Sequence, residues 1–289
     1  MVEPGKTAVR RAIGRQLKRM RNDRGINLST AAKVTENGPK ALMQVERGRN
    51  LPQLADIEAL LSTYNHSEQI PHFQHVLTEA GANKPKDWWE RRFPAEVVGE
   101  QAKLLLSCEA SAVELMVYQA QLVPDLFRTA GYAEAVLRAE DPELDDEEAG
   151  LGVSLVQGRQ EVLERADAPR ITCVLDEAAL RRRVGGTDVL RAQLEHLAEL
   201  ARRPRIDIRV LTDDLGAHPG SGGSFTRIVL LPELPTYPGI VHVKVGPHDV
   251  YYEEPDEIAP FDTIFARLRE QALPADESLA AIEEAARRD

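Results

Sequence analysis

Lys40 and Gln44, a cation and an amide four residues apart, are the side chains best placed for chemistry in this sequence. Residues four apart share one face of a helix, and the small Ala41 leaves that face open. Gln can bond the edge of adenine, whereas Lys and Arg bond guanine or phosphate. We therefore expect Lys40 and Gln44 to approach base edges in a DNA major groove. Arg47 and Arg49 follow directly, and we expect both to approach phosphates.

Two short helices joined by a tight turn are predicted for residues 26–48. Asn27 is suited to cap the first helix, and we also expect it at the DNA interface. The turn is Glu36-Asn37-Gly38, since Asn and Gly accept the left-handed backbone values that a reversal needs. Pro39 then stands where a first helical residue loses nothing by lacking an N–H, and the second helix runs to about Arg47.

Charge is divided unevenly along the chain. Residues 1–50 hold 12 Lys and Arg against 4 Asp and Glu, a balance of +8, whereas the remainder holds 24 against 43, a balance of −19. A helix predicted from about Lys6 to Arg24 carries eight of the cations, which would repel one another without an anionic partner. Arg10 or Arg11 on this helix therefore joins the expected phosphate contacts. A basic head on an acidic body is the asymmetry expected when only the head meets DNA.

The first helix together with residues 26–48, which end in Val45-Glu46-Arg47-Gly48, resembles the helix-turn-helix domain of phage-repressor-type (Xre-like) regulators. The resemblance implies a five-helix, all-α head that binds double-stranded operator DNA, with the protein acting as a homodimer. It also implies that Arg21 pairs with Glu46. Glu46 is the only acid between Asn37 and Gln53, so it has strong physical reason to find a guanidinium.

The length of 289 residues favours two domains, and 43% hydrophobic with 29% charged residues is typical of globular protein. We predict a helix-turn-helix head at residues 1–80, with its fifth helix over about 67–80. A linker and Trp-Trp segment follows at 81–96, beginning with the Gly/Pro-containing stretch 81–86. The body, residues 97–289, is predicted to begin with helices over 97–107 and 121–138. The acidic run 141–148 is predicted to be a solvated helix start.

Strands dominate the pattern from residue 171 onward. Buried strands are predicted at 171–175 and 206–211, with an amphipathic helix over 188–202 between them. Such a strand-helix-strand unit favours parallel pairing. Shorter strands near 225–231, 240–245 and 250–252 precede a helix over 255–273. The fold class is therefore multidomain, with an all-α head followed by a larger α/β body that has a mixed sheet.

The body has a resemblance of its own, carried by QLVPDLFRTAGYAEAVL (121–137), VLDEAALRRRVGG (174–186), RAQLEHLAEL (191–200) and GAHPGSGGSF (216–225). These phrases resemble the uncharacterised C-terminal domain of actinobacterial Xre-type regulators. Members are often encoded beside a small acidic protein and are described as antitoxin-like. The resemblance implies a transcriptional regulator whose partners include operator DNA and a small acidic protein.

A small-molecule or peptide sensor site is expected beyond the carboxyl ends of the parallel strands, where open α/β sheets bind ligands. The candidates are Asp176, Arg181, Arg182 and His218. The alternative is structural: the neighbouring glycines mark turns, and the Arg run is a solvated face.

An enzymatic alternative depends on His242, Lys244 and Asp249, whose spacing is that of phospholipase-D-like phosphodiesterases. There His is the nucleophile and Lys binds phosphate. Simple strand alternation also explains His242 and Lys244, so we expect the protein not to be an enzyme. A third possibility is a protein-interaction module that does not bind DNA.

No metal or cofactor is expected, because only Cys108 and Cys173 occur and the seven His form no ligand pair. No apolar run approaches the length of a membrane span, and the N-terminus lacks the apolar core of a signal peptide. We therefore expect no membrane contact and a cytoplasmic location.

Overall fold

The computed structural model describes residues 5–79, 87–94, 97–100 and 102–288. The chain forms two compact units. The N-terminal unit comprises Met1–Arg92, Ala102–Ala112 and Val229–Gly239, and the C-terminal unit comprises the remaining segments. The predicted linker stretch 81–86 and the predicted end of the fifth helix at Ala80 lie outside the described residues. The domain boundaries at residues 80 and 97 remain a prediction.

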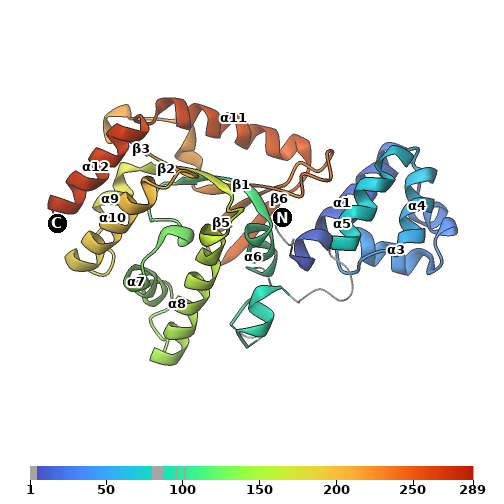
Figure 1. Ribbon diagram of the computed structural model, residues 1–289, viewed down its shortest axis with the longest axis horizontal. Helices are drawn as coiled ribbons and strands as arrows, with labels where there is room; N and C mark the ends of the chain where they lie inside the picture. Colours follow the sequence, from blue (N-terminus) through green and yellow to red (C-terminus); the bar gives the residue numbers. More distant parts are fainter. Residues whose placement is uncertain (1–4, 80–86, 95–96, 101, 289) are drawn as a thin grey trace. The chain divides into compact units, whose positions relative to one another are not determined.

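The N-terminal unit is helical (Figure 1). Its elements in chain order are α1 (Lys6–Asp23), α2 (Leu28–Ala31), η1 (Ala32–Val34), α3 (Gly38–Glu46), α4 (Leu54–Thr63), η2 (Ser67–Gln69), α5 (Ile70–Glu79), η3 (Trp88–Arg91) and α6 (Ala102–Ala110). The apolar stripe of α1 is fully buried at Val9, Ile13 and Leu17. These residues are four apart and therefore lie on one face of the helix, which packs α1 into the core of the unit.

Two glycines allow α1 and α3 to approach closely. A Cβ at Gly14 of α1 would lie 2.2 Å from the carbonyl oxygen of Val45 on α3. Gly48, just after α3, has a φ of +69°, and a Cβ there would lie 2.9 Å from the Cα of Arg11. Both positions therefore require glycine, and together they fix how α3 sits against α1.

The C-terminal unit contains a six-stranded sheet in the order β3-β2-β1-β4-β5-β6. The strands are β1 (Ala112–Gln119), β2 (Arg170–Asp176), β3 (Ile206–Leu211), β4 (Phe225–Leu230), β5 (Ile240–Val245) and β6 (His248–Tyr252). β1, β2 and β3 pair in parallel, whereas β5 pairs antiparallel with both β4 and β6. The predicted parallel pairing of β2 with β3 is confirmed, as is the fold class of a helical head and a mixed α/β body.

Helices cover both faces of this sheet (Figure 1). They are α7 (Ala130–Glu140), α8 (Asp146–Gln160), α9 (Glu177–Arg181), α10 (Thr187–Ala201), α11 (Pro255–Gln271) and α12 (Ala275–Arg288), with short 3-10 turns such as η4 (Asp125–Phe127) between elements. One core cluster joins Tyr118, Val174 and Phe225 of the sheet to Phe265 and Leu268 of α11. α7 and α8 lie on the opposite face, where Glu140 of α7 bonds Lys244 of β5.

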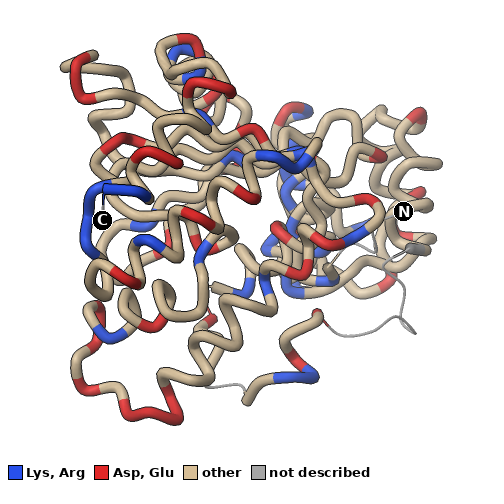
Figure 2. Tube along the Cα trace, turned by 60° about the vertical axis from the view of Figure 1, so that its left-hand side comes forward, with Lys and Arg blue, Asp and Glu red and all other residues tan. Residues whose placement is uncertain are grey.

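Two predicted helix starts are wrong. The helix predicted from residue 97 is α6 and begins at Ala102. The helix predicted from residue 121 is interrupted: η4 comes first, and α7 begins at Ala130, where the hydroxyl of Thr129 accepts the N–H of Tyr132 at 3.4 Å. The N-cap at Thr129 therefore sets where α7 begins. The helix start predicted in the acidic run 141–148 is confirmed, because the end of this run forms the cap and first turn of α8 (Figure 2). The extent of α8 and the whole of α12 were not predicted.

Candidate functional site

The helix that carries Lys40 and Gln44 is held by its apolar side. Leu42 and Val45 of α3 are buried, and Gly38 begins the helix with a φ of +71°. The preceding helix α2 is capped as predicted, because Oδ1 of Asn27 accepts the N–H of Thr30 at 2.8 Å. The remaining face of α3 is thereby left to solvent.

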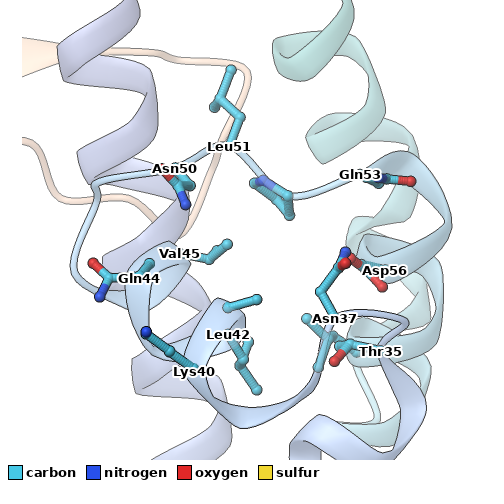
Figure 3. A pocket seen from close by; sticks show the side chains of 13 residues that line it. Thr35, Asn37, Lys40, Leu42, Gln44, Val45, Asn50, Leu51, Gln53 and Asp56 are labelled. Carbon is cyan, nitrogen blue, oxygen red and sulfur yellow. The ribbon is translucent and has the colours of Figure 1, made fainter.

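Lys40, Ala41 and Gln44 border a depression of about 460 Å³ beside α3 (Figure 3). Lys40 and Gln44 stand on its α3 side, and Gln53 and Asp56 on its α4 side. The full lining is Thr35, Asn37, Lys40, Ala41, Leu42, Gln44, Val45, Asn50, Leu51, Pro52, Gln53, Asp56 and Leu60. The structure therefore brings the two predicted base-reading side chains together on one open surface, which is lined by both polar and apolar side chains.

Arg49 stands at the edge of the same surface, where its Nη1 donates to Oε1 of Gln44 at 3.4 Å. Arg47 is exposed, and its carbonyl accepts Nη1 of Arg11 at 3.4 Å. Arg10 lies elsewhere, in a second depression of about 780 Å³ that Arg49 also lines. Asn27 is exposed, with its side chain used by the cap of α2.

Sequence reasoning missed several polar residues of this surface. Asn50 and Gln53 in the loop after α3, and Thr35 before the turn, line the depression with Lys40 and Gln44. Their position in the sequence next to α3 could have identified them, because loops that flank a helix line the same surface as that helix. Asp56 is buried and accepts the N–H of Glu36 at 3.1 Å, so it holds the turn before α3.

The predicted pair of Arg21 and Glu46 is confirmed. Nε of Arg21 donates to Oε1 of Glu46 at 2.6 Å, and Nη2 donates to Oε2 at 2.8 Å. Nη1 donates to the carbonyl of Ile26 at 2.8 Å. The hydrogen bonds that Arg21 donates to Glu46 raise the pKa of the Arg21 guanidinium above its ordinary value. This pair ties α1 to the end of α3 and to the start of the helix-turn-helix.

The four candidate sensor residues are only partly brought together. Nε2 of His218 lies 3.6 Å from Oδ2 of Asp176, and both side chains are largely buried. Arg181 instead forms ion pairs with Glu177 and Asp213. Arg182 is exposed, with its Nε donating to the carbonyl of Gln121 at 3.1 Å.

Tyr118 joins His218 and Asp176, and sequence reasoning did not find it. Its ring stands edge-on to the imidazole of His218, with 6.0 Å between centroids. Burial, together with the charge of Asp176, raises the pKa of Tyr118 to about 12. A Cβ on Gly220 would lie 2.5 Å from the Tyr118 ring, so the loop after β3 packs against β1 at that point. A carboxylate, an imidazole and a phenol thus meet at the carboxyl ends of β1 and β2.

The residues of the enzymatic alternative are paired within the body. Nε2 of His242 lies 2.6 Å from Oδ1 of Asp249, and this hydrogen bond lowers the pKa of Asp249. Nζ of Lys244 donates to both oxygens of Glu140, at 2.8 and 3.0 Å. His242 is buried and Lys244 is exposed, so the two face different surroundings although they lie on one side of β5.

Among the described residues, no helix is both long and apolar enough to cross a membrane, and no three His, Cys, Asp or Glu gather as metal ligands. Residues 12–70 match a helix-turn-helix domain family, so the N-terminal part is of the class found in DNA-binding regulators. Residues 102–284, more than half of the chain, match the family described as a domain of unknown function (DUF5753), and the chain belongs to that family. Comparisons with curated proteins and with solved structures gave no match.

Proposed function

We propose that the chain is a sequence-specific transcriptional regulator of the phage-repressor type, which reads operator DNA through the outer face of α3. The observation that supports this best is the placing of Lys40 and Gln44 on the open face of a helix whose other face is buried, inside the matched helix-turn-helix region. A single helix of this kind reads only a few base pairs. The protein therefore acts as a homodimer on a two-fold-related operator.

A band-shift with DNA from upstream of its own gene, repeated over a series of salt concentrations, tests this function. Saturable binding that prefers this DNA over unrelated duplexes is expected. Absence of preference at every salt concentration, or absence of binding at low salt, would refute sequence-specific regulation.

Two substitutions separate base reading from phosphate contact. Gln44→Ala should relax the preference at one base pair by about 1–3 kcal/mol, because the amide suits the edge of adenine. Arg49→Ala should instead weaken binding to all sequences alike and lower the salt slope by about 1. If both variants merely scale the affinity uniformly, Gln44 does not read a base.

The body, in this proposal, senses a small molecule or a small acidic protein, as in antitoxin-like regulators. The meeting of Asp176, His218 and Tyr118 at the carboxyl ends of the parallel strands supports a sensor site there. Co-expression with a small acidic protein encoded beside this gene tests the protein alternative. Retention of that protein by residues 85–289 is expected, and retention only by chains that contain the basic head would move the contact to the head.

We propose further that the body is not a phosphodiesterase. Lys244, the cation that would bind phosphate, is already held by both oxygens of Glu140. Purified protein should leave a generic phosphodiester intact. Hydrolysis that is lost in His242→Ala would overturn this view and favour the enzymatic alternative.

A further inference from the structure

The first turn of α1 is capped from a distant part of the chain. Its N-cap residue, Gly5, supplies no side-chain cap. Acceptors come from residues 87–111 instead: Ser111 Oγ accepts the N–H of Gly5 at 2.7 Å, Asp87 Oδ2 that of Thr7 at 3.3 Å, and Ser107 Oγ that of Ala8 at 2.9 Å. All of these residues belong to the N-terminal unit. The first N–H groups of a helix have no partner within the helix, and these three acceptors supply one for each of Gly5, Thr7 and Ala8.

The same side chains continue as a hydrogen-bond chain that ends at Arg10. Oγ of Ser107 donates to Oδ1 of Asp87 at 2.9 Å, and Oγ1 of Thr7 donates to Oδ2 of Asp87 at 2.6 Å. Nη2 of Arg10 then donates to Oγ1 of Thr7 at 3.0 Å. Asp87 and Ser107 are buried. The guanidinium of Arg10 is therefore anchored through Thr7 to a fixed, buried carboxylate.

Arg10 is one of three cations that line the 780 Å³ depression, together with Lys6 and Arg49. The other lining residues that the structure describes are Asn50, Leu51, Pro52, Leu54, Leu77 and Thr78, and none of the described lining residues is acidic. Asn50, Leu51 and Pro52 also line the depression beside α3. The two depressions therefore flank one loop, and a duplex that meets Lys40 and Gln44 would bring its backbone toward these three cations.

We propose that Lys6, Arg10 and Arg49 bind a phosphate of the DNA backbone, and that Thr7 and Asp87 are positioning residues for Arg10. The inference depends on the proposed DNA-binding function and adds a second contact region to it. A guanidinium held in place loses less side-chain entropy on binding than a free one. Asp87, which directly precedes η3, thereby makes a DNA contact depend on a segment outside the matched helix-turn-helix region.

The salt dependence of binding tests this directly, using the full chain and a mixed-sequence duplex. Each phosphate neutralised by a cation adds about 0.9 to the slope of log K against log salt. Arg10→Ala should lower the slope by about that amount. Thr7→Val, which keeps the shape but removes the hydroxyl, should lower the slope in the same direction, and Thr7→Ser should restore it. Lys18→Ala is the matched control, since Lys18 is an exposed cation of α1 outside both depressions.

Each outcome bears on a separate part of the inference. An unchanged slope in Arg10→Ala refutes the phosphate site, and is also the result expected if these cations serve an acidic protein instead. If Arg10→Ala lowers the salt slope but Thr7→Val keeps the wild-type slope, Thr7 and Asp87 do not position Arg10. Thermal unfolding of Thr7→Val shows whether the fold is retained. If the wild-type chain binds no duplex at any salt concentration, the proposed function itself fails.

Discussion

Arg21 and Glu46 show what a single ion pair can contribute when it is removed from water. Their side chains are only 10% and 6% exposed, and both carboxylate oxygens of Glu46 accept from the guanidinium. Surface pairs contribute about 0–1 kcal/mol, but a buried charge that loses its partner is costly. The Arg21–Glu46 pair belongs to the buried case. The sequence predicted the pair but did not show how deeply it is buried.

We expect Glu46→Gln and Arg21→Ala each to lower the free energy of unfolding by about 3–5 kcal/mol, because each leaves a buried group without its partner. The double variant should lose clearly less than the sum of the two, as measured by urea unfolding in a double-mutant cycle. Glu68→Gln is the control, since Glu68 pairs with His66 in an exposed position and its replacement should leave the free energy of unfolding nearly unchanged. Coupling near zero between Arg21 and Glu46 would contradict a structural role for the pair.

At the scale of elements, η4 is tied to α8 through one carboxylate. Asp125 of η4 forms ion pairs with Arg128, at 2.5 Å, and with Arg159 of α8. Nε2 of Gln160 donates to the carbonyl of Asp125 at 3.0 Å. Burial alone would raise the pKa of Asp125, but the charges of Arg128 and Arg159 hold it well below its usual range.

The stability of the body should therefore fall in acid in a way that depends on Asp125. A carboxyl whose pKa is lower in the folded chain stabilises the fold above its ordinary pKa of about 4, and that contribution disappears as the pH falls toward the folded value. Asp125→Asn should be less stable than the wild type at neutral pH and lose less stability on acidification below about pH 4. Urea unfolding at a series of pH values measures this. Glu147→Gln on the same helix α8 should keep the wild-type acid profile, and an unchanged profile in Asp125→Asn would refute the role.

Local signals explain which elements could be predicted. The limits of β3 and β5 and nearly those of α10 follow from short apolar runs and three-and-four spacing. For α8 only the acidic start was predicted, because the rest of its sequence has no clear apolar stripe, with only Ala149 and Val156 buried. α12 does bury one helical face, with Ser278, Ile282 and Ala286 at four-residue spacing, but only Ile282 of these three is a large apolar residue.

At the scale of the whole molecule, long-range contacts set the limit of prediction. Lys40 with Gln44, and Arg21 with Glu46, were predictable because helical spacing or local charge brings them together. Tyr118 beside His218, and Asp87 beside Thr7, were not, because they depend on how segments distant in sequence pack. The compact units show the same limit: α6 and Val229–Gly239 lie far along the chain from the helix-turn-helix but share its unit.

The distant capping of α1 also has a consequence for protein synthesis. The acceptors for its first turn lie 80 to 106 residues later in the chain, and the hydroxyl of Thr236, which donates to Gln16 at 2.8 Å, lies 220 residues later. While the ribosome is still making α5, the N–H groups of Gly5, Thr7 and Ala8 have only water as a partner, so this turn stays frayed in the nascent chain. The start of α1 is thus among the first residues to be made, but its full set of capping hydrogen bonds cannot form before residue 111 has been made.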